Sequence, residues 1–155
     1  MKTVGIIVEY NPLHNGHLHH ILETRRISKC DCLIAVMSSS FTQRGEPAII
    51  DKFTRTKMAL HNSVDLVIEL PFVYTVQSAD IFAYGAVSIL NHLGVDEIYF
   101  GSESGNIEEL TFLNDIIHSS EYDILIQQYL KQGNSYPTSS NMAVNELTKS
   151  TIYHQ

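Results

Sequence analysis

Four short runs of consecutive apolar residues recur along the first two-thirds of the chain, and β-branched side chains are frequent in them. They cover residues 4–8, 33–37, 66–70 and 98–100. Short unbroken apolar runs are typical of strands that are buried on both faces of a sheet. We therefore expect four strands of a buried, parallel sheet.

Stretches with apolar residues at helical spacing lie between and after these runs. They predict helices over 16–28, 51–61, 78–93, 121–131 and about 139–147. Gly94 is a residue type that commonly follows a helix C-terminus. Asn106, with Glu109 three residues later, predicts the N-cap of a further helix. The residues after Gly133 are rich in Ser, Thr and Asn and weakly patterned, which predicts loose packing there.

Strands that alternate with helices imply right-handed crossovers and a parallel sheet. We therefore expect an α/β fold, a Rossmann-like doubly wound parallel sheet with extra C-terminal helices. Ligands of such folds bind at the carboxyl ends of the strands. This rule directs attention to residues 9–17, 38–47, 71–77 and 101–105.

Composition narrows the class of protein further. The 155 residues are enough for one domain with a hydrophobic core, and 44% apolar with 17% charged residues is ordinary globular composition. No stretch approaches the roughly 18 apolar residues of a membrane span, and Glu9 interrupts an N-terminal run too short for a signal-peptide core. Cys30 and Cys32 are the only cysteines, so neither a disulfide framework nor a four-thiolate zinc site is available. We expect a protein of the reducing cytoplasm, with no role at a membrane.

Charge is distributed unevenly along the sequence. Residues 1–60 hold eight Lys and Arg against five Asp and Glu, a local charge of +3, whereas the remainder holds two against twelve, or -10. A polyphosphate would be drawn to the N-terminal part. The same distribution also fits charges on solvated helix faces.

The segment 9–17, between the first expected strand and helix, carries the most chemistry. Unpaired N–H groups at a helix start favour phosphate, and Gly16 allows a ligand to approach the backbone closely. His14 and His17 lie three residues apart, so both imidazoles can donate hydrogen bonds to phosphate oxygens. Two other interpretations stay open: surface histidines on a helix, or a metal site completed by Glu9 or Asp51.

Two further regions at strand ends are candidate binding loops. In the polar loop 38–47 and the helix start after it, Arg44 and Lys52 are candidate contacts to phosphate or to a carboxylate such as acetate. Arg55 fits a salt bridge with Asp51 equally well. After the last expected strand, Gly101 allows close approach of a base or ribose, although glycines after strands often only form turns.

His14-Asn15-Gly16-His17 matches the HxGH motif of the nucleotidylyltransferase superfamily. Longer stretches resemble the N-terminal part of the bacterial tRNA(Met) cytidine acetate ligase family, over about residues 1–137. They are EYNPLHNGHLHHI at 9–21, QRGEPAIIDKFTRTKMAL at 43–60, VDLVIELP at 64–71, QSADIFAYGAV at 77–87 and FGSESG at 100–105. The resemblance implies a nucleotidylyltransferase-like ATP-binding domain over 1–137, followed at 138–155 by the start of a truncated region.

This resemblance also implies a reaction. Acetate and ATP form acetyl-adenylate with release of pyrophosphate, and the acetyl group passes to N4 of the wobble cytidine of elongator tRNA(Met). His14 and His17 would steady the triphosphate, with Mg²⁺ accompanying ATP. The family's ATP-binding positions carry over onto Ile7, Val8, Glu9, Tyr10, Asn11, Pro12, Leu13, His14, Asn15, Gly16, His17, Leu18, His19, His20 and Gly101.

The chain departs from the family in three ways. Family members are much longer, and the family's NNxLGxEY stretch has no counterpart here. The family's loop begins Met-Ser-Gly-Asn-Phe, whereas this chain has Ser39 and Ser40 at the two differing positions. The tRNA contacts are expected in a downstream region, and no DNA-binding role is expected. A stand-alone nucleotidylyltransferase with a small acceptor, a non-catalytic nucleotide-binding module and, least favoured, a metal-binding protein are the alternatives.

Overall fold

The computed structural model describes residues 1–102 and 105–152, which form two compact units, Met1–Gly101 and Ser102–Gln155. The first unit contains a parallel sheet of β1 (Thr3–Val8), β2 (Cys32–Met37), β3 (Leu66–Glu69) and β4 (Glu97–Ile98), in the order β3-β2-β1-β4. The predicted α/β class and parallel sheet are confirmed. The predicted functional boundary after residue 137 stays a prediction.

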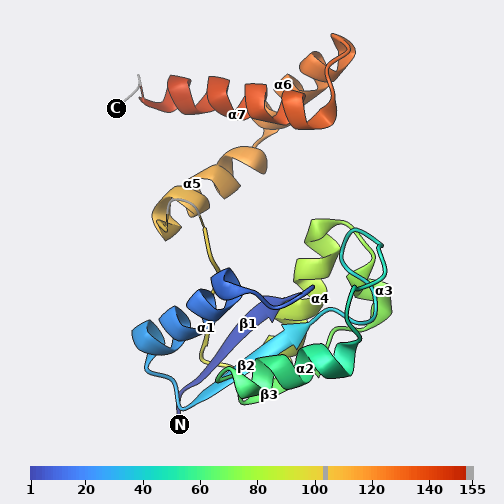
Figure 1. The fold of residues 1–155 in the computed structure, drawn as a ribbon. Coiled ribbons are helices and arrows are strands. Elements are labelled where there is room, and N and C mark those ends of the chain that lie inside the picture. Colours follow the sequence, from blue (N-terminus) through green and yellow to red (C-terminus); the bar gives the residue numbers. More distant parts are fainter. Residues whose placement is uncertain (103–104, 153–155) are drawn as a thin grey trace. The chain divides into compact units, whose positions relative to one another are not determined.

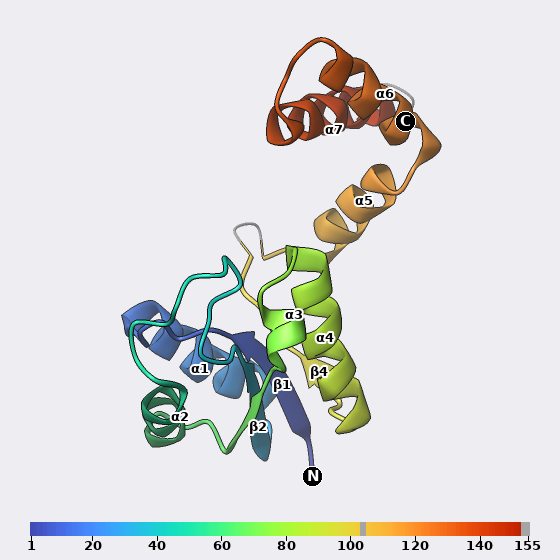
Figure 2. The same cartoon turned by 90° about the vertical axis from the view of Figure 1, so that its right-hand side faces the viewer.

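Helices cover both faces of the sheet, as Figures 1 and 2 show. α1 (Asn15–Ser28) and α2 (Lys52–His61) pack on one face, and α4 (Ala79–His92) packs on the other, after the short α3 (Phe72–Thr75). Each face has its own apolar cluster. The first cluster contains Val4, Ile6, Val8, Tyr10, Ile21, Leu33, Ala35, Met37, Ala59 and Val64. The second contains Ile34, Val36, Leu70, Ala86 and Leu90.

The contact between α4 and β1 depends on a residue without a side chain. A Cβ atom at Gly5 would lie 2.6 Å from Cδ2 of Leu90, which is closer than two carbon atoms can approach. This glycine therefore lets Leu90 of α4 pack directly on the backbone of β1. Gly94 has a φ of +68° just after α4, which confirms the predicted helix stop.

The first unit differs from the prediction in one strand and in one additional helical turn. The fourth strand covers only residues 97–98 instead of 98–100, although the N–H of Tyr99 still donates to the carbonyl of Gly5 at 2.9 Å. An edge strand has one neighbour only, so its ladder ends sooner than the apolar run suggests. The helical turn α3 was not predicted, because four residues show no helical period; the Thr75 hydroxyl stabilises it by donating to the Leu70 and Pro71 carbonyls.

The second unit consists of α5 (Ile107–Ile117), α6 (Ser120–Lys131) and α7 (Tyr136–Ile152). The side chain of Asn106 accepts from the N–H groups of Glu108 and Glu109, which confirms the predicted N-cap. The expectation of loose packing after Gly133 is wrong, because α7 begins at Tyr136 and packs against α6. Ala143 of α7 is buried against α6. Polar residues cap the start of α7, where the Ser135 hydroxyl accepts from the Thr138 N–H. No helix in the described ranges is long and apolar enough to span a bilayer.

Candidate nucleotide-binding site

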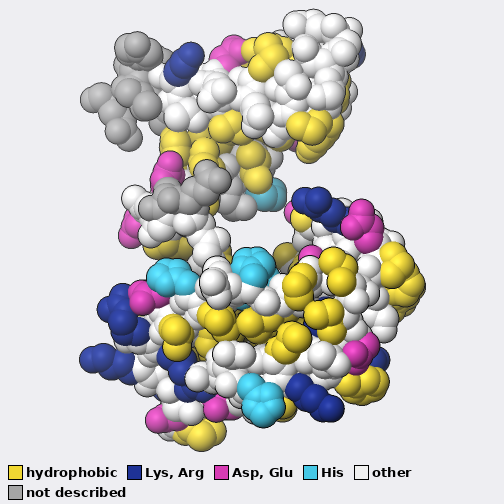
Figure 3. Space-filling view, in the orientation of Figure 1, with side chains coloured by type: hydrophobic (Ala, Val, Ile, Leu, Met, Phe, Trp, Pro, Cys, Tyr) yellow, Lys and Arg dark blue, Asp and Glu magenta, His cyan; other side chains and the backbone are white. Residues whose placement is uncertain are grey.

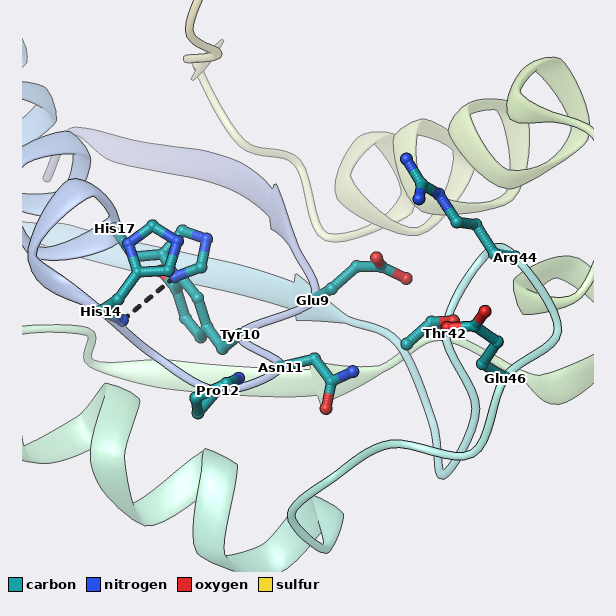
Figure 4. A pocket seen from close by; sticks show the side chains of 9 residues that line it. All are labelled: Glu9, Tyr10, Asn11, Pro12, His14, His17, Thr42, Arg44 and Glu46. Atoms are coloured by element: carbon teal, nitrogen blue, oxygen red, sulfur yellow. Dashed lines mark hydrogen bonds between the residues drawn. The ribbon is translucent and has the colours of Figure 1, made fainter.

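A pocket of about 320 Å³ opens at the carboxyl end of β1. In the sheet, β2 and β3 lie on one side of β1 and β4 lies on the other, so the direction of winding changes at this strand. In a doubly wound sheet this switch point is the expected place for a ligand. Two segments of the first unit line the pocket: residues 9–17, here called the histidine wall, and residues 41–47, here called the hairpin (Figure 4). The lining residues are Glu9, Tyr10, Asn11, Pro12, His14, His17, Thr42, Arg44 and Glu46.

His14 and His17 form a capping box at the start of α1. The N–H of Gly16 donates to Nδ1 of His14 at 3.1 Å, and the N–H of His14 donates to Nδ1 of His17 at 3.3 Å. The two rings are stacked, with 3.7 Å between their centroids and 23° between their planes (Figure 4). A Cβ atom at residue 16 would lie 3.0 Å from Cε1 of His14, so the glycine makes room for this ring.

These hydrogen bonds favour one tautomer of each imidazole. A backbone N–H can only donate, so each Nδ1 must carry a lone pair, and in the neutral ring the proton is then on Nε2. Two Nε2–H donors, side by side at the positive end of α1, are a suitable arrangement for the oxygens of a phosphate chain.

The surroundings of the pair favour the neutral form of His17. Burial lowers the pKa of His17, and the nearby His14 and His20 lower this pKa further. Burial, and then His19, also lowers the pKa of His20. Near neutral pH the site therefore presents hydrogen-bond donors without adding a full positive charge at His17.

The buried ring of Tyr10 packs against the ring of His17. The side chain of Tyr10 is fully buried, its ring lies 5.0 Å from the His17 ring at 59°, and its backbone has a φ of 50° in the left-handed region. Its hydroxyl group has no hydrogen-bond partner among the described residues, and burial raises the pKa of this phenol well above its usual value. The ring limits the movement of His17, while the hydroxyl is left unsatisfied.

The hairpin has a short antiparallel base, where Phe41 pairs with Pro47, and a tight turn at its tip. The N–H of Thr42 donates to the Glu46 carbonyl at 2.8 Å, and the N–H of Gly45 donates to the Thr42 carbonyl at 3.0 Å. Gly45 has a φ of +78°, which the turn requires and which other residues adopt with strain. Arg44 lies beside this turn, at the rim of the pocket (Figure 4).

Residues of the histidine wall hold the hairpin in place. A carboxylate oxygen of Glu9 accepts from the N–H of Gln43 at 2.6 Å, and the side-chain oxygen of Asn11 accepts from the N–H of Ile49 at 2.7 Å. On its other side, the Gln43 amide donates to the Gln77 carbonyl at 2.6 Å. The two walls are therefore linked by direct hydrogen bonds.

Arg55 forms a second link, and not the salt bridge with Asp51 that its spacing suggested. Its fully buried guanidinium donates to the carbonyls of Glu9 at 2.6 Å, Ile50 at 3.0 Å and Ser39. Asp51 instead caps α2, where its carboxylate accepts from two N–H groups of the first turn. Carbonyls at the ends of β1 and β2 thus converge on one buried cation.

Ion pairs offset the positive charge that the sequence placed in residues 1–60. Four basic residues there pair with carboxylates, three of which come from later in the chain; the pairs are Lys2–Glu97, Arg25–Asp65, Arg26–Glu23 and Lys52–Glu69. Figure 3 shows Lys and Arg side chains interspersed with Asp and Glu on the visible face of the first unit. Residues 1–101 hold eight basic against ten acidic residues, or -2. Local donors, and not net charge, must therefore attract an anion.

The structure brings seven of the predicted site residues together at one pocket. They are Glu9, Tyr10, Asn11, Pro12, His14, His17 and Arg44. The other predicted residues lie outside its lining: Ile7, Val8, Leu13, Asn15, Gly16, Leu18, His19, His20, Lys52 and Gly101. Lys52 lies 2.7 Å from both carboxylate oxygens of Glu69 and lines a separate pocket of about 230 Å³. Gly101 is exposed, with nothing within 4 Å of where a Cβ atom would be.

Two pocket residues, Thr42 and Glu46, were not predicted. The sequence did single out the loop that contains them, through Arg44. Residues 42–46 form a tight turn, so no strand period could have marked Thr42 and Glu46. Nothing in the sequence indicated that residues 41–47 pair with each other.

The parallel sheet and a pocket at the end of β1, with two histidines at a helix start, are features typical of nucleotide-binding α/β domains. The family model described as HIGH Nucleotidyl Transferase matches residues 1–155. The chain therefore belongs to the HIGH nucleotidyl transferase family.

More specific relatives match nearly the whole chain. It is 51% identical over 154 residues to a tRNA(Met) cytidine acetate ligase from Caldicellulosiruptor bescii, covering 98% of this chain and 38% of the relative. It is 53% identical over 151 residues to the ligase from Lysinibacillus sphaericus, covering 96% of this chain and again 38% of the relative. The chain thus spans well under half the length of these curated relatives and corresponds to their N-terminal part.

Solved structures give the same result for the fold. The apo crystal structure of Thermotoga maritima TmcAL has a TM-score of 0.90 and 45% identity, covering 97% of this chain and 36% of that chain. The structure of TmcAL bound with alpha-thio ATP has a TM-score of 0.88 and 45% identity, covering 97% of this chain and 37% of that chain.

Proposed function

We propose that this chain is the ATP-binding, adenylate-forming part of a tRNA(Met) cytidine acetate ligase, and that His14 and His17 bind the triphosphate. The fixed Nε2–H donors of the stacked pair carry this proposal. A relative with 45% identity binds alpha-thio ATP, and the ligases named above share about half of this chain's residues. We also propose a cytoplasmic location, because the proposed substrates, ATP and tRNA, are found there.

In the proposed reaction, a carboxylate oxygen of acetate attacks the α-phosphorus of ATP, and the bond to the β-phosphate oxygen breaks. Pyrophosphate leaves and acetyl-adenylate remains. Donors aimed at the phosphate oxygens stabilise the negative charge that grows on them during this displacement. The two imidazoles therefore act as donors and not as nucleophiles.

For the first half of the reaction, before the acceptor base is bound, Arg44 is the proposed contact to acetate or to phosphate, because it lines the same pocket as the histidines. Lys52 is the weaker candidate, since its ammonium group already pairs with Glu69 and faces another pocket. The remaining ATP contacts carried over from the family, Gly101 among them, stay predictions.

Mg²⁺ enters this proposal as part of its complex with ATP. Across residues 1–102 and 105–152, no group of three or more His, Cys, Asp and Glu side chains is placed to hold a metal ion. The phosphate oxygens would then supply most of the ligands of the metal. The contacts to the body of the tRNA, as distinct from the acceptor base, are proposed to lie in the region that the longer relatives possess downstream.

Isothermal titration of the chain with ATP tests the histidine site. We expect the His14→Ala, His17→Ala double variant to bind ATP about 10- to 100-fold more weakly, because two hydrogen bonds to charged oxygens are lost. His61→Ala, which changes an exposed histidine at the end of α2, is the matched control and should bind normally. Equal ATP affinity in the double variant and the wild type would refute the assignment.

A pyrophosphate-release assay separates the proposed reaction from its alternatives. Release that depends on acetate supports the ligase. Release that requires a small phosphate-bearing acceptor, and not acetate, would identify a stand-alone nucleotidylyltransferase. ATP binding without release under any acceptor would identify a nucleotide-binding module.

A further inference from the structure

The wall of the pocket opposite the imidazoles is unsuited to a phosphate chain. Glu9, at the start of the histidine wall, and Glu46, in the hairpin, place carboxylates there, and Arg44 lines the same pocket; in Figure 4 all three lie away from the imidazoles of His14 and His17. Two carboxylates repel a polyanion, so this side of the pocket calls for a ligand with neutral hydrogen-bond donors.

A buried hydroxyl gives a second, independent sign of a ligand on this side. Thr42 is only 5% exposed, it lines the pocket, and its hydroxyl has no hydrogen-bond partner among the described residues. Buried polar groups are nearly always paired, and an unpaired one that borders a cavity is a place where a ligand or water supplies the partner. The hydroxyl can donate or accept.

The two carboxylates have different tasks. An oxygen of Glu9 already accepts from the N–H of Gln43 at 2.6 Å, so this side chain anchors the hairpin. Glu46 is exposed at the pocket, and within the described ranges no group donates a hydrogen bond to its carboxylate. Glu46 is therefore the acceptor that is available to a ligand, and Arg44, two residues earlier, supplies donors to the same pocket.

A carboxylate acceptor and a guanidinium donor that line one pocket are complementary to a nucleobase edge that has an exocyclic amine next to a ring nitrogen. Cytosine has this edge: its N4 amine donates, and its N3 and O2 accept. Carboxylates accept from the cytosine N4 amine, and enzymes that modify a base read its Watson–Crick edge in a pocket. We propose that the hairpin binds the Watson–Crick edge of the acceptor cytidine, with Glu46 at the N4 amine and Arg44 at N3 and O2.

This inference rests on the proposed function, and it gives the second half of that reaction a proton acceptor. The lone pair of N4 attacks the carbonyl carbon of acetyl-adenylate, a C–N bond forms, and the bond from this carbon to the phosphate oxygen breaks. AMP leaves with that electron pair. The Glu46 carboxylate takes the proton that N4 must lose and passes it to water. Without this transfer, the attacking nitrogen would keep a positive charge.

Adenine also carries an amine next to a ring nitrogen, so the shared chemistry includes the base of ATP. Neutral nucleosides distinguish the two sources, since they have no phosphate to bind at the histidines. Cytidine, uridine and adenosine are each titrated into the ¹⁵N-labelled chain, and the backbone amides of residues 42–46 are followed by NMR. We expect cytidine to shift these signals and uridine to bind about tenfold more weakly. An equal response to uridine, or a stronger one to adenosine, would overturn the inference.

Variants assign the recognition to the named side chains. Glu46→Gln should weaken cytidine binding about tenfold, whereas Glu108→Gln, on the exposed first turn of α5, should not change it. With synthetic acetyl-adenylate and cytidine, Glu46→Gln should lower the enzyme-dependent formation of N4-acetylcytidine by about 100-fold, whereas Glu108→Gln should leave both this transfer and the affinity for ATP as in the wild type. Unchanged transfer in Glu46→Gln, or no transfer above background by the wild type, would contradict the role of Glu46.

The two proposals can fail separately. If ATP does not bind at His14 and His17 but cytidine shifts residues 42–46, the adenylation site is wrong and the base site stands. If ATP binds and the hairpin does not distinguish cytidine from uridine, the base site is wrong and the adenylation site stands.

Discussion

The two walls of the pocket are held in place by different kinds of contact. In the histidine wall the hydrogen bonds that position the rings are local and join residues two or three positions apart, His14 with Gly16 and His14 with His17. The hairpin depends on contacts between residues distant in sequence. The bond between Glu9 and Gln43 spans 34 positions, and the bond between Asn11 and Ile49 spans 38.

This difference determines what each wall needs in order to form. The local wall needs only the start of α1, since the capping box arises together with the helix. The hairpin needs the finished sheet, because its anchors are groups at the ends of β1 and β2. We expect changes to the first kind of contact to alter ligand binding with little loss of stability, and changes to the second kind to destabilise the whole first unit.

The largest effect is expected from Arg55→Met. It removes the donors to three carbonyls and leaves these buried or half-buried polar groups without this partner. We expect the free energy of unfolding to fall by about 3–5 kcal/mol, measured by chemical denaturation. Amide exchange in residues 41–47 should rise more than exchange in residues 14–17.

Two variants keep this prediction testable if Arg55→Met does not fold. Arg55→Lys keeps the charge and part of the hydrogen bonding, so it should lose less stability. Lys57→Met changes an exposed cation on the same helix, and we expect a change within about 0.5 kcal/mol. Similar losses in Arg55→Met and Lys57→Met would show that the buried guanidinium does not hold the hairpin.

Gly16→Ala tests the local wall. The added methyl group would lie 3.0–3.2 Å from atoms of the His14 ring and push this ring from its position. We expect ATP affinity, measured by titration calorimetry, to fall about tenfold, while stability changes by less than about 1 kcal/mol, because alanine suits a helix better than glycine. In a His14→Ala background the same change should have almost no effect, since there is no ring left to displace. A further tenfold loss there would show that the glycine acts in another way.

The same difference explains how far the sequence could predict this molecule. β1, the helix start at residues 15–16 and the His14–His17 pair are set by neighbouring residues, so patterns and spacing were enough to find them. The position of Arg55 could not be predicted in this way, because the carbonyls that it contacts belong to residues 5 to 46 positions away. α7 was missed as a packed element for a similar reason: the surface that Ala143 buries is supplied by α6.

Tyr10→Phe tests whether the histidine wall uses the ring of Tyr10 or its hydroxyl group. The ring contact with His17 is kept, and a buried hydroxyl without a partner is removed. We expect stability to rise by about 1 kcal/mol in denaturant unfolding. The matched change Tyr122→Phe removes a hydroxyl that bonds to the Ser140 hydroxyl at 2.8 Å, so it should lower stability by about 1 kcal/mol. Equal losses in the two variants would mean that the Tyr10 hydroxyl does have a partner, such as a bound water.

The smallest effect is expected from pH, because the imidazoles concerned are only half-buried. The pKa of His17 and the pKa of His20 are both lowered in the folded chain, chiefly by burial. Below about pH 6.5 the unfolded chain therefore binds more protons at these residues than the folded chain does, and stability falls as the pH decreases. Denaturant unfolding at intervals from pH 7.5 to 5 should show this decline before the carboxylates begin to titrate.

Protonation of His17 would also place a proton on the Nδ1 atom that accepts from the N–H of His14, so the decline is tied to the geometry of the histidine wall. The double variant His17→Asn, His20→Gln keeps polar acceptors without a titrating ring, and its stability should depend less on pH over this range. His61→Asn changes an exposed histidine on α2 and should keep the slope of the wild type. If the double variant keeps the full slope, other groups cause the loss, and the histidine wall does not limit stability in mild acid.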